Sequence, residues 1–238
     1  FERLPHDRRA EVLIFQPRAM KKTKMTEAIS AKVGFLSAIS SASPHFNSFK
    51  ALIPNDVQFD FIGLELVHSS LYELKGRKET VLKKTLELAD RHQWQGVILS
   101  GAHVEILNPG LLDDLCSSLV IPVTTALASS VTALKRFSVK RALLMTPFDE
   151  PLNQIIRDYL ANAEIEAFSP PTMLRHFTEA LKLSPEEVNS LTKNALEGHQ
   201  DVDAIYFQGA VLDPLKVLER MESELNTTVV ASNPAMLW

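Results

Sequence analysis

Short apolar segments that alternate with longer amphipathic segments constrain the fold of this chain more than any other feature of its sequence. From residue 32 onward, runs such as Gly96–Ser100 and Ala204–Gln208 have the length and apolar character of buried strands. Between such runs lie segments like Arg77–His92, whose apolar residues recur every three to four positions. Strands alternating with helices of this length predict βαβ units and mainly parallel sheets.

The remaining predicted elements follow the same alternation. Strands are predicted at 33–39, 57–66, 120–125, 141–146 and 227–232, and helices at 45–53, 111–119, 129–137, 150–163 and 214–225. A mainly helical stretch follows residue 163, and its Ser184 and Glu187 have the spacing of a capping box. Residues 1–31 hold one short apolar run and a basic Lys-Lys-Thr-Lys patch, and we expect an extension packed on the body.

Two segments of the chain share one layout. Residues 96–130 and 204–237 each contain an apolar strand, a polar residue, Gly-Ala, a helix, a strand and a small-polar turn. This weak repeat predicts two α/β halves facing each other across a cleft, although chance similarity between two βαβ units is the alternative. Ligands of open parallel sheets bind beyond the carboxyl ends of the strands. The turns Ser100–His103 and Gln208–Val211 are therefore predicted on opposite walls of one cleft.

Composition and charge argue against several classes of protein. The chain is 45% hydrophobic and 23% charged, the balance of an ordinary soluble globular protein. Its net charge of −4 gives no electrostatic footprint for nucleic acid, and no apolar run approaches the roughly 18 residues of a membrane span. The opening residues lack the pattern of a signal peptide, so the cytoplasm is the expected location.

Common catalytic and metal-binding motifs are absent from the sequence. A single cysteine, Cys116, excludes a disulfide framework, and the seven histidines form neither His-Glu-x-x-His nor His-x-His. The Gly101–Ala102 turn lacks the further glycines of a dinucleotide fingerprint, and no Gly-x-Ser-x-Gly elbow occurs. We expect neither a metal nor a cofactor at the site. We expect a small molecule as the substrate, and the chain could form a homodimer.

Several segments resemble one family. The C-terminal Ser-Asn-Pro-Ala-Met-Leu-Trp resembles the Ser-Asn-Gln-Ala-Thr-Leu-Trp signature of maleate isomerase and arylmalonate decarboxylase-like proteins in the aspartate/glutamate racemase superfamily. The segments 33–54, 121–134, 143–160 and 183–188 resemble other pieces of that family in the same order. The likeness covers 32–238. It implies an α/β fold of two flavodoxin-like parallel-sheet halves, related by a pseudo-twofold axis, with a cofactor-free active-site cleft between them.

The resemblance also implies domain boundaries. The first α/β half would span 32–128, with 230–238 packing back onto it, and the second half would span 129–229.

Catalytic cysteines of the family have no counterpart here. The family uses one cysteine per half, and the matching positions hold Gly101 or Ala102 in the first half and Gly209 in the second. Cys116 lies on the helix after the first turn. We expect its thiol to lie in the core, where it cannot substitute.

The substrate-holding tyrosine of the family's Thr-Pro-Tyr segment is Phe148 here, and its first-loop asparagine falls among Ser40, Ser41 and Ala42. With these polar groups lost, the cleft is expected to be wider and less polar, suited to a larger apolar ligand.

Three residues are the catalytic candidates. His103 follows the first Gly-Ala turn and could move protons near pH 7, unless it is a solvent-exposed histidine at a helix start. Gln208 could polarise a substrate oxygen from the opposite wall, unless it only bonds backbone. His68, with Glu65, follows the second strand and would face the cleft, unless it is a solvated loop residue.

Substrate-binding candidates follow the strand ends. Thr124 and Thr125 could bind a ligand oxygen, with helix capping as the plainer interpretation, and leucine at Ala102 or Ala210 is predicted to block the ligand without unfolding the chain. The full predicted set is Ser40, Ser41, Ser100, Gly101, Ala102, Thr124, Thr125, Phe148, Gly209, Ala210 and Val211.

Three functions remain open from these residues. The first is a cofactor-independent lyase or isomerase for dehydration, double-bond migration or cyclisation of a fairly apolar small molecule of secondary metabolism. The second is an isomerase, racemase or decarboxylase of a small dicarboxylate. The third is a non-catalytic small-molecule binding protein on a degenerate enzyme scaffold.

Overall fold

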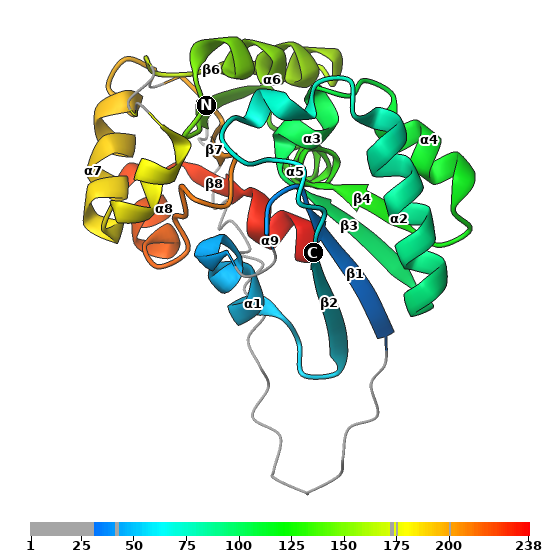
Figure 1. Cartoon of the computed structure of the whole chain (residues 1–238). Coiled ribbons are helices and arrows are strands. Elements are labelled where there is room, and N and C mark those ends of the chain that lie inside the picture. The colour runs from blue at the N-terminus through cyan, green and yellow to red at the C-terminus, as the bar shows by residue number, and fades with distance from the viewer. Residues whose placement is uncertain (1–30, 41–42, 172–173, 175, 200) are drawn as a thin grey trace, which may run out of the picture.

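Two four-stranded parallel sheets form the centre of the molecule (Figure 1). The computed structural model describes residues 31–40, 43–171, 174, 176–199 and 201–238. The first sheet has the strand order β2-β1-β3-β4 and the second β6-β5-β7-β8. Their bounds are β1 Ala31–Ser37, β2 Val57–Gly63, β3 Gly96–Ser100, β4 Val123–Thr125, β5 Arg141–Met145, β6 Glu166–Phe168, β7 Ala204–Phe207 and β8 Thr228–Ala231. The shared order confirms two α/β halves of one topology.

Helices connect the strands and cover both faces of each sheet. The α-helices are α1 Asn47–Leu52, α2 Lys78–His92, α3 Ala102–Ile106, α4 Leu111–Ser118, α5 Ala126–Arg136, α6 Glu150–Asn162, α7 Pro185–Leu196, α8 Leu218–Leu225 and α9 Ser232–Leu237. Short 3₁₀ helices are η1 Pro44–Phe46, η2 Leu71–Leu74 and η3 Phe177–Lys182. No described helix has both the length and the apolarity that a membrane crossing needs.

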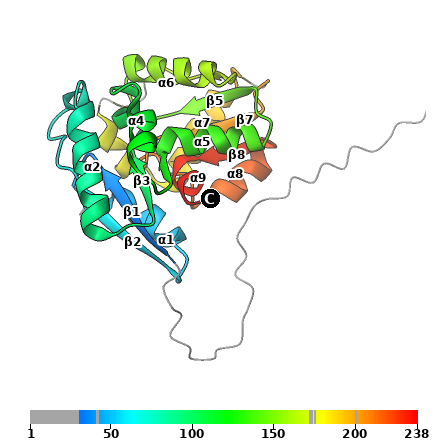
Figure 2. The same ribbon diagram turned by 90° about the vertical axis from the view of Figure 1, so that its right-hand side faces the viewer.

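Alternating side chains of β1 show how the first sheet is covered. Phe35 packs with Phe49 of α1 and Met236 of α9 on one face, whereas Leu36 belongs to the core shared with α2 and α4 on the other. Burial on both faces is the usual state of a parallel sheet, and it explains the continuous apolar runs in the sequence. Helix α9 follows the last strand but packs against α5 and α1 (Figure 2).

Local capping explains where several helices begin. Helix α5 starts at Ala126, three residues before its predicted start at 129, because the Thr125 hydroxyl accepts the backbone N–H of Ala128. The predicted capping box at Ser184 and Glu187 is present at the start of α7. The short strand β6 and the C-terminal helix α9 were not predicted.

Cys116 corrects a prediction about the core. Helix α4 buries Leu111 and Leu115, and Cys116 follows Leu115 by one residue, about 100° around the helix. Its side chain is therefore exposed, whereas we expected it in the core.

Candidate functional site

Phe148 brings together loops from both halves at the carboxyl ends of the strands. Its ring lies 6.1 Å, centroid to centroid, from the ring of His103, which follows β3, and the two rings meet edge to face. On its other side it approaches the turn after β7, because a Cβ placed on Gly209 would lie 3.3 Å from Phe148 Cζ. The two Gly-Ala turns thus meet at one aromatic side chain from the β5–α6 loop.

Glycine suits both turns because of their backbone conformation, and a Cβ at either position would be crowded. Gly101 has φ of 90° and Gly209 has φ of 114°, values that residues with a Cβ rarely adopt. A Cβ on Gly101 would lie 2.7 Å from His103 Cε1, and a Cβ on Gly209 would lie 3.0 Å from Pro147 Cδ. His103, Pro147 and Phe148 therefore occupy the space beside the two glycines.

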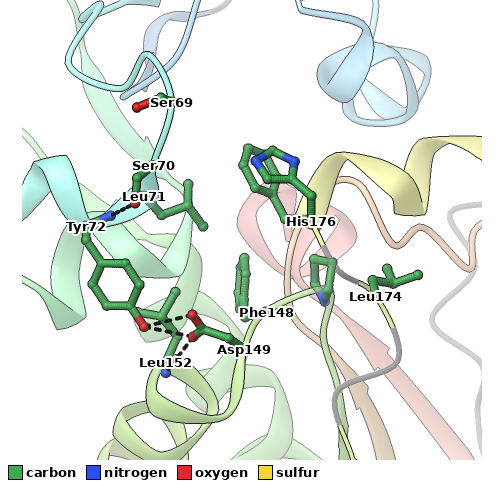
Figure 3. A pocket seen from close by; sticks show the side chains of 11 residues that line it. Ser69, Ser70, Leu71, Tyr72, Phe148, Asp149, Leu152, Leu174 and His176 are labelled. Carbon is green, nitrogen blue, oxygen red and sulfur yellow. Dashed lines mark hydrogen bonds between the residues drawn. The ribbon is translucent and has the colours of Figure 1, made fainter.

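A cavity of about 120 Å³ lies beside Phe148 (Figure 3). Its walls come from the loop after β2 with η2, from the β5–α6 loop with α6, and from the segment leading into η3, so both halves contribute. The lining residues are Ser69, Ser70, Leu71, Tyr72, Pro147, Phe148, Asp149, Leu152, Leu174, His176 and Phe177. Apart from Phe148, sequence reasoning missed this set, because most of its members lie on loops and not directly at strand ends.

Tyr72 and Asp149 join the two halves at the cavity wall. The Tyr72 hydroxyl lies 2.8 and 3.0 Å from the two carboxylate oxygens of Asp149 (Figure 3). Asp149 also caps α6 by accepting the backbone N–H of Leu152 at 3.2 Å. Burial and the bond to Asp149 raise the pKa of Tyr72 to about 12, so this hydroxyl remains protonated at neutral pH.

His103 carries a buried nitrogen without a protein partner. The side chain is half-buried, and its Nδ1 forms no hydrogen bond with the described residues. Burial lowers the pKa of His103 to about 4, because the cation loses its hydration there. The imidazole is thus neutral at pH 7.

Two amide side chains at neighbouring strand ends also keep unpartnered atoms. Gln208 is 1% exposed; its Oε1 accepts the hydroxyl of Tyr206, while its Nε2 has no partner among the described groups. Asn233 is 3% exposed, and its Oδ1 is likewise unpartnered there. Phe207 pairs with Ala231 across β7 and β8, so both amides follow adjacent strands. Asn233 was missed, although the C-terminal signature contains it.

A second buried polar cluster lies between the halves. Glu105 of α3 accepts hydrogen bonds from Thr125 and from Tyr159 of α6, the latter at 2.7 Å. Burial raises the pKa of Glu105. Thr125 thus bonds Glu105 and caps α5. Helix capping was the plainer of its two predicted roles. Thr124 bonds Ser129 at 2.7 Å.

His68 does not join the other catalytic candidates. It is exposed, and its Nδ1 lies 3.2 Å from Glu73 Oε2 at the surface. Its neighbours Ser69 and Ser70 line the cavity instead.

Ala102 was predicted to line the cleft, but it lies in the core. Its side chain has no exposed surface and belongs to the main core cluster, so it is packed structure and not a cavity wall.

The other predicted binding residues vary in burial. Ser41 lies outside the described residues, and Ser40 is exposed. Ser100 and Val211 are buried, whereas Ala210 is half-buried. Within the described ranges, no three His, Cys, Asp or Glu side chains gather in a way that could hold a metal ion.

Comparisons with known sequences identify similar proteins. The profile of the arylmalonate decarboxylase family matches residues 48–238. A maleate isomerase from Alcaligenes faecalis is 26% identical over 114 residues, which is 47% of this chain and 44% of that protein. The match thus spans less than half the length of this curated relative.

Solved structures share the fold. A double mutant of arylmalonate decarboxylase in the liganded form has a TM-score of 0.75 at 20% identity, covering 88% of this chain and 90% of that one. A maleate isomerase from Pseudomonas putida, solved with maleate, gives 0.71 at 17% identity over 87% and 89%. A Nocardia farcinica maleate cis-trans isomerase with a covalently bound succinylcysteine intermediate gives 0.64 at 18% identity over 86% and 89%.

Proposed function

The chain belongs to the arylmalonate decarboxylase family, and from that premise we propose that it is a cofactor-independent lyase that decarboxylates a small carboxylic acid bearing an apolar group. The observation that carries this proposal is the cavity beside Phe148, which receives walls from both halves and has no lysine or arginine among its lining residues.

The apolar part of the cavity wall, which has no lysine or arginine beside it, favours loss of a carboxylate. Leu71, Phe148 and Leu152 form part of that wall. A carboxylate placed against such side chains loses its hydration without gaining a counter-ion, whereas the CO₂ that leaves is neutral. The cavity thus destabilises the starting acid more than the product.

The size of the cavity limits the substrate. An apolar cavity of about 150 Å³ accommodates benzene. The volume of about 120 Å³ therefore suits a group no larger than a single small ring or branched alkyl chain. The polycyclic substrate and cyclisation expected from sequence receive no support from a cavity of this size.

His103 and Gln208 do not line the cavity, but both lie next to its Phe148 wall: the His103 ring meets Phe148, and Gln208 precedes Gly209, which approaches the same ring. We propose that their unpartnered atoms serve the intermediate. The proposed acid is a malonate, which carries two carboxyl groups on its α-carbon. When the bond to one of them breaks, CO₂ leaves, and the electron pair stays on the α-carbon and delocalises onto the oxygens of the other carboxyl group. The free N–H of Gln208 Nε2 would stabilise that oxygen charge. His103 would then give a proton to the α-carbon and regain one from water. An anionic substrate beside the ring raises the pKa of His103, which makes the imidazolium accessible.

A thiol mechanism is not proposed. Cys116 is the only cysteine of the chain and lies exposed on α4. A covalent cysteine adduct like the one in the Nocardia farcinica enzyme would need a cysteine at one of the two turns, where Gly101 and Gly209 stand.

Decarboxylation in D₂O tests the proposal. Phenylmalonate and small alkylmalonates are expected to release CO₂ and to yield acids with deuterium on the α-carbon, measured by NMR. His103→Gln should lower the rate at least tenfold, because the α-carbon loses its proton donor.

His68→Gln is the matched control, since that ring is exposed and bonded to Glu73, and its rate should stay within about twofold of the native rate. Isomerisation of maleate without any CO₂ release from malonates would contradict the proposal and favour the isomerase alternative.

A further inference from the structure

We propose that Tyr206 is a positioning residue, which holds the side-chain amide of Gln208 so that its Nε2, and not its Oε1, is left free for the substrate. This inference rests on the proposed function, because it deepens the role of Gln208 in that site.

The contact is direct and local. Tyr206 and Gln208 are two residues apart at the end of β7, so their side chains leave the same face of the strand. The Tyr206 hydroxyl donates its proton to Gln208 Oε1, and Nε2 is left without a partner among the described groups. An amide has one acceptor end and one donor end. A hydroxyl that donates to the oxygen therefore selects the orientation that leaves the N–H groups free.

The surroundings keep the hydroxyl in its donor state. Tyr206 has no exposed surface. Burial raises the pKa of Tyr206 and outweighs the hydrogen bond of Ser130, which lowers it; Tyr159 and Glu105 add smaller increases, so the phenol remains protonated. Both side chains are buried, so bulk solvent does not compete for Gln208 Oε1.

The amide lies one residue from the cavity wall, although Gln208 does not itself line the cavity. Gln208 is followed by Gly209, which packs against Pro147 and Phe148 at the cavity wall. Strand β7 lies inside the sheet between β5 and β8, and all of its residues are buried. A donor held on such a rigid element needs little reorganisation when charge develops on the substrate.

Removal of one hydroxyl group tests this role. In Tyr206→Phe the amide can rotate, so kcat for malonate decarboxylation should fall about tenfold while KM stays within about twofold. Gln208→Ala should show a similar loss, and the double variant should be no slower than either single variant, because both changes remove one function.

Tyr159→Phe is the matched control. It also removes a buried tyrosine hydroxyl, but that hydroxyl bonds Glu105 and not Gln208. Its kcat should stay within about twofold of the native value. The second readout is the ¹⁵N side-chain NH₂ resonance of Gln208, assigned by its disappearance in Gln208→Ala. This resonance should shift and exchange faster with water in Tyr206→Phe only.

The outcomes separate the two proposals. An unchanged Gln208 amide resonance in Tyr206→Phe overturns the positioning role, whatever the activity. Equal effects of Tyr159→Phe and Tyr206→Phe on both readouts would also overturn it, since they would indicate general loosening of the core. A resonance that changes only in Tyr206→Phe, with no malonate turnover by the native enzyme, leaves the positioning role supported and defeats the proposed decarboxylation.

Discussion

His103 is the side chain whose chemistry depends most on its immediate neighbours. In the sequence His103 follows the Gly101 turn, and one interpretation was that it moves protons near pH 7. The structure sets its ring against Phe148 and buries Nδ1, which lowers its pKa to about 4. The imidazole is therefore neutral at pH 7, and a proton-transfer role requires a substrate charge nearby that raises its pKa.

The lowered pKa of His103 predicts a pH-dependent stability. Between pH 6.5 and about 4 the unfolded chain binds a proton at this residue that the folded chain does not. The stability is therefore complete above pH 6.5 and falls as the pH drops, by up to about 3 kcal/mol at pH 4. Urea denaturation at several pH values should show a shallower acid loss for His103→Gln. Parallel curves for the two proteins would contradict the burial of this ring.

Helix α3 places its first two side chains differently from what the sequence suggested. The Gly-Ala sequence suggested that Ala102 lines a cleft, but Ala102 opens the helix and faces the core. His103, one position later, points to Phe148 instead. Glu105 further along anchors the same helix to Thr125 and Tyr159. Which face of such a five-residue helix is buried depends on these tertiary partners, because no periodicity develops over so few residues.

Two leucine substitutions measure this difference. Ala102→Leu should destabilise the fold by roughly 1–3 kcal/mol, because a fully buried methyl position has no room for a larger side chain. Ala210→Leu should lower stability by less than about 1 kcal/mol, since Ala210 is half-buried. Urea denaturation of both variants gives these values. If Ala102→Leu were as stable as the native protein, its side chain would have to face open space.

Hydrogen bonds between hydroxyl and carboxylate groups join the two α/β halves. Tyr72 of η2 bonds Asp149 at the start of α6, and Ser48 of α1 bonds Asp213 in the loop after β7. In both cases the hydroxyl follows a strand of the first sheet and the carboxylate follows a strand of the second. The Tyr72–Asp149 bond is also part of the cavity wall, so closure of the halves and shape of the cavity are linked.

Loss of the Tyr72 bond should loosen this contact without unfolding the molecule. Tyr72→Phe is expected to lower the global free energy of unfolding by at most about 1 kcal/mol, because Tyr72 is 40% exposed. Backbone amides of η2 and the first turn of α6 should exchange faster with solvent, while those of α7 provide an unchanged internal reference. Unaltered exchange in η2 and α6 would show that the bond does not hold the halves together.

Local sequence was enough to predict much of the architecture. The apolar run of β3, the capping box of α7 and the periodic pattern of α2 are decided by neighbouring residues, and the structure has each of them where it was predicted. The repeat in the sequence likewise predicted two α/β halves, and the two sheets share one strand order.

The candidate site depended on contacts between residues far apart in the chain. Tyr72 and Asp149 are separated by 77 positions, and His103 and Phe148 meet only because the two halves pack together. The space beside Gly101 and Gly209 is filled by side chains that no local pattern assigns to it. Local patterns in the sequence decided which residues form strands, helices and turns, because these depend on backbone conformation and periodicity. The cavity walls and the unpartnered atoms of Gln208 and His103 were decided by the tertiary packing alone, since burial and hydrogen-bond partners are properties of the assembled halves.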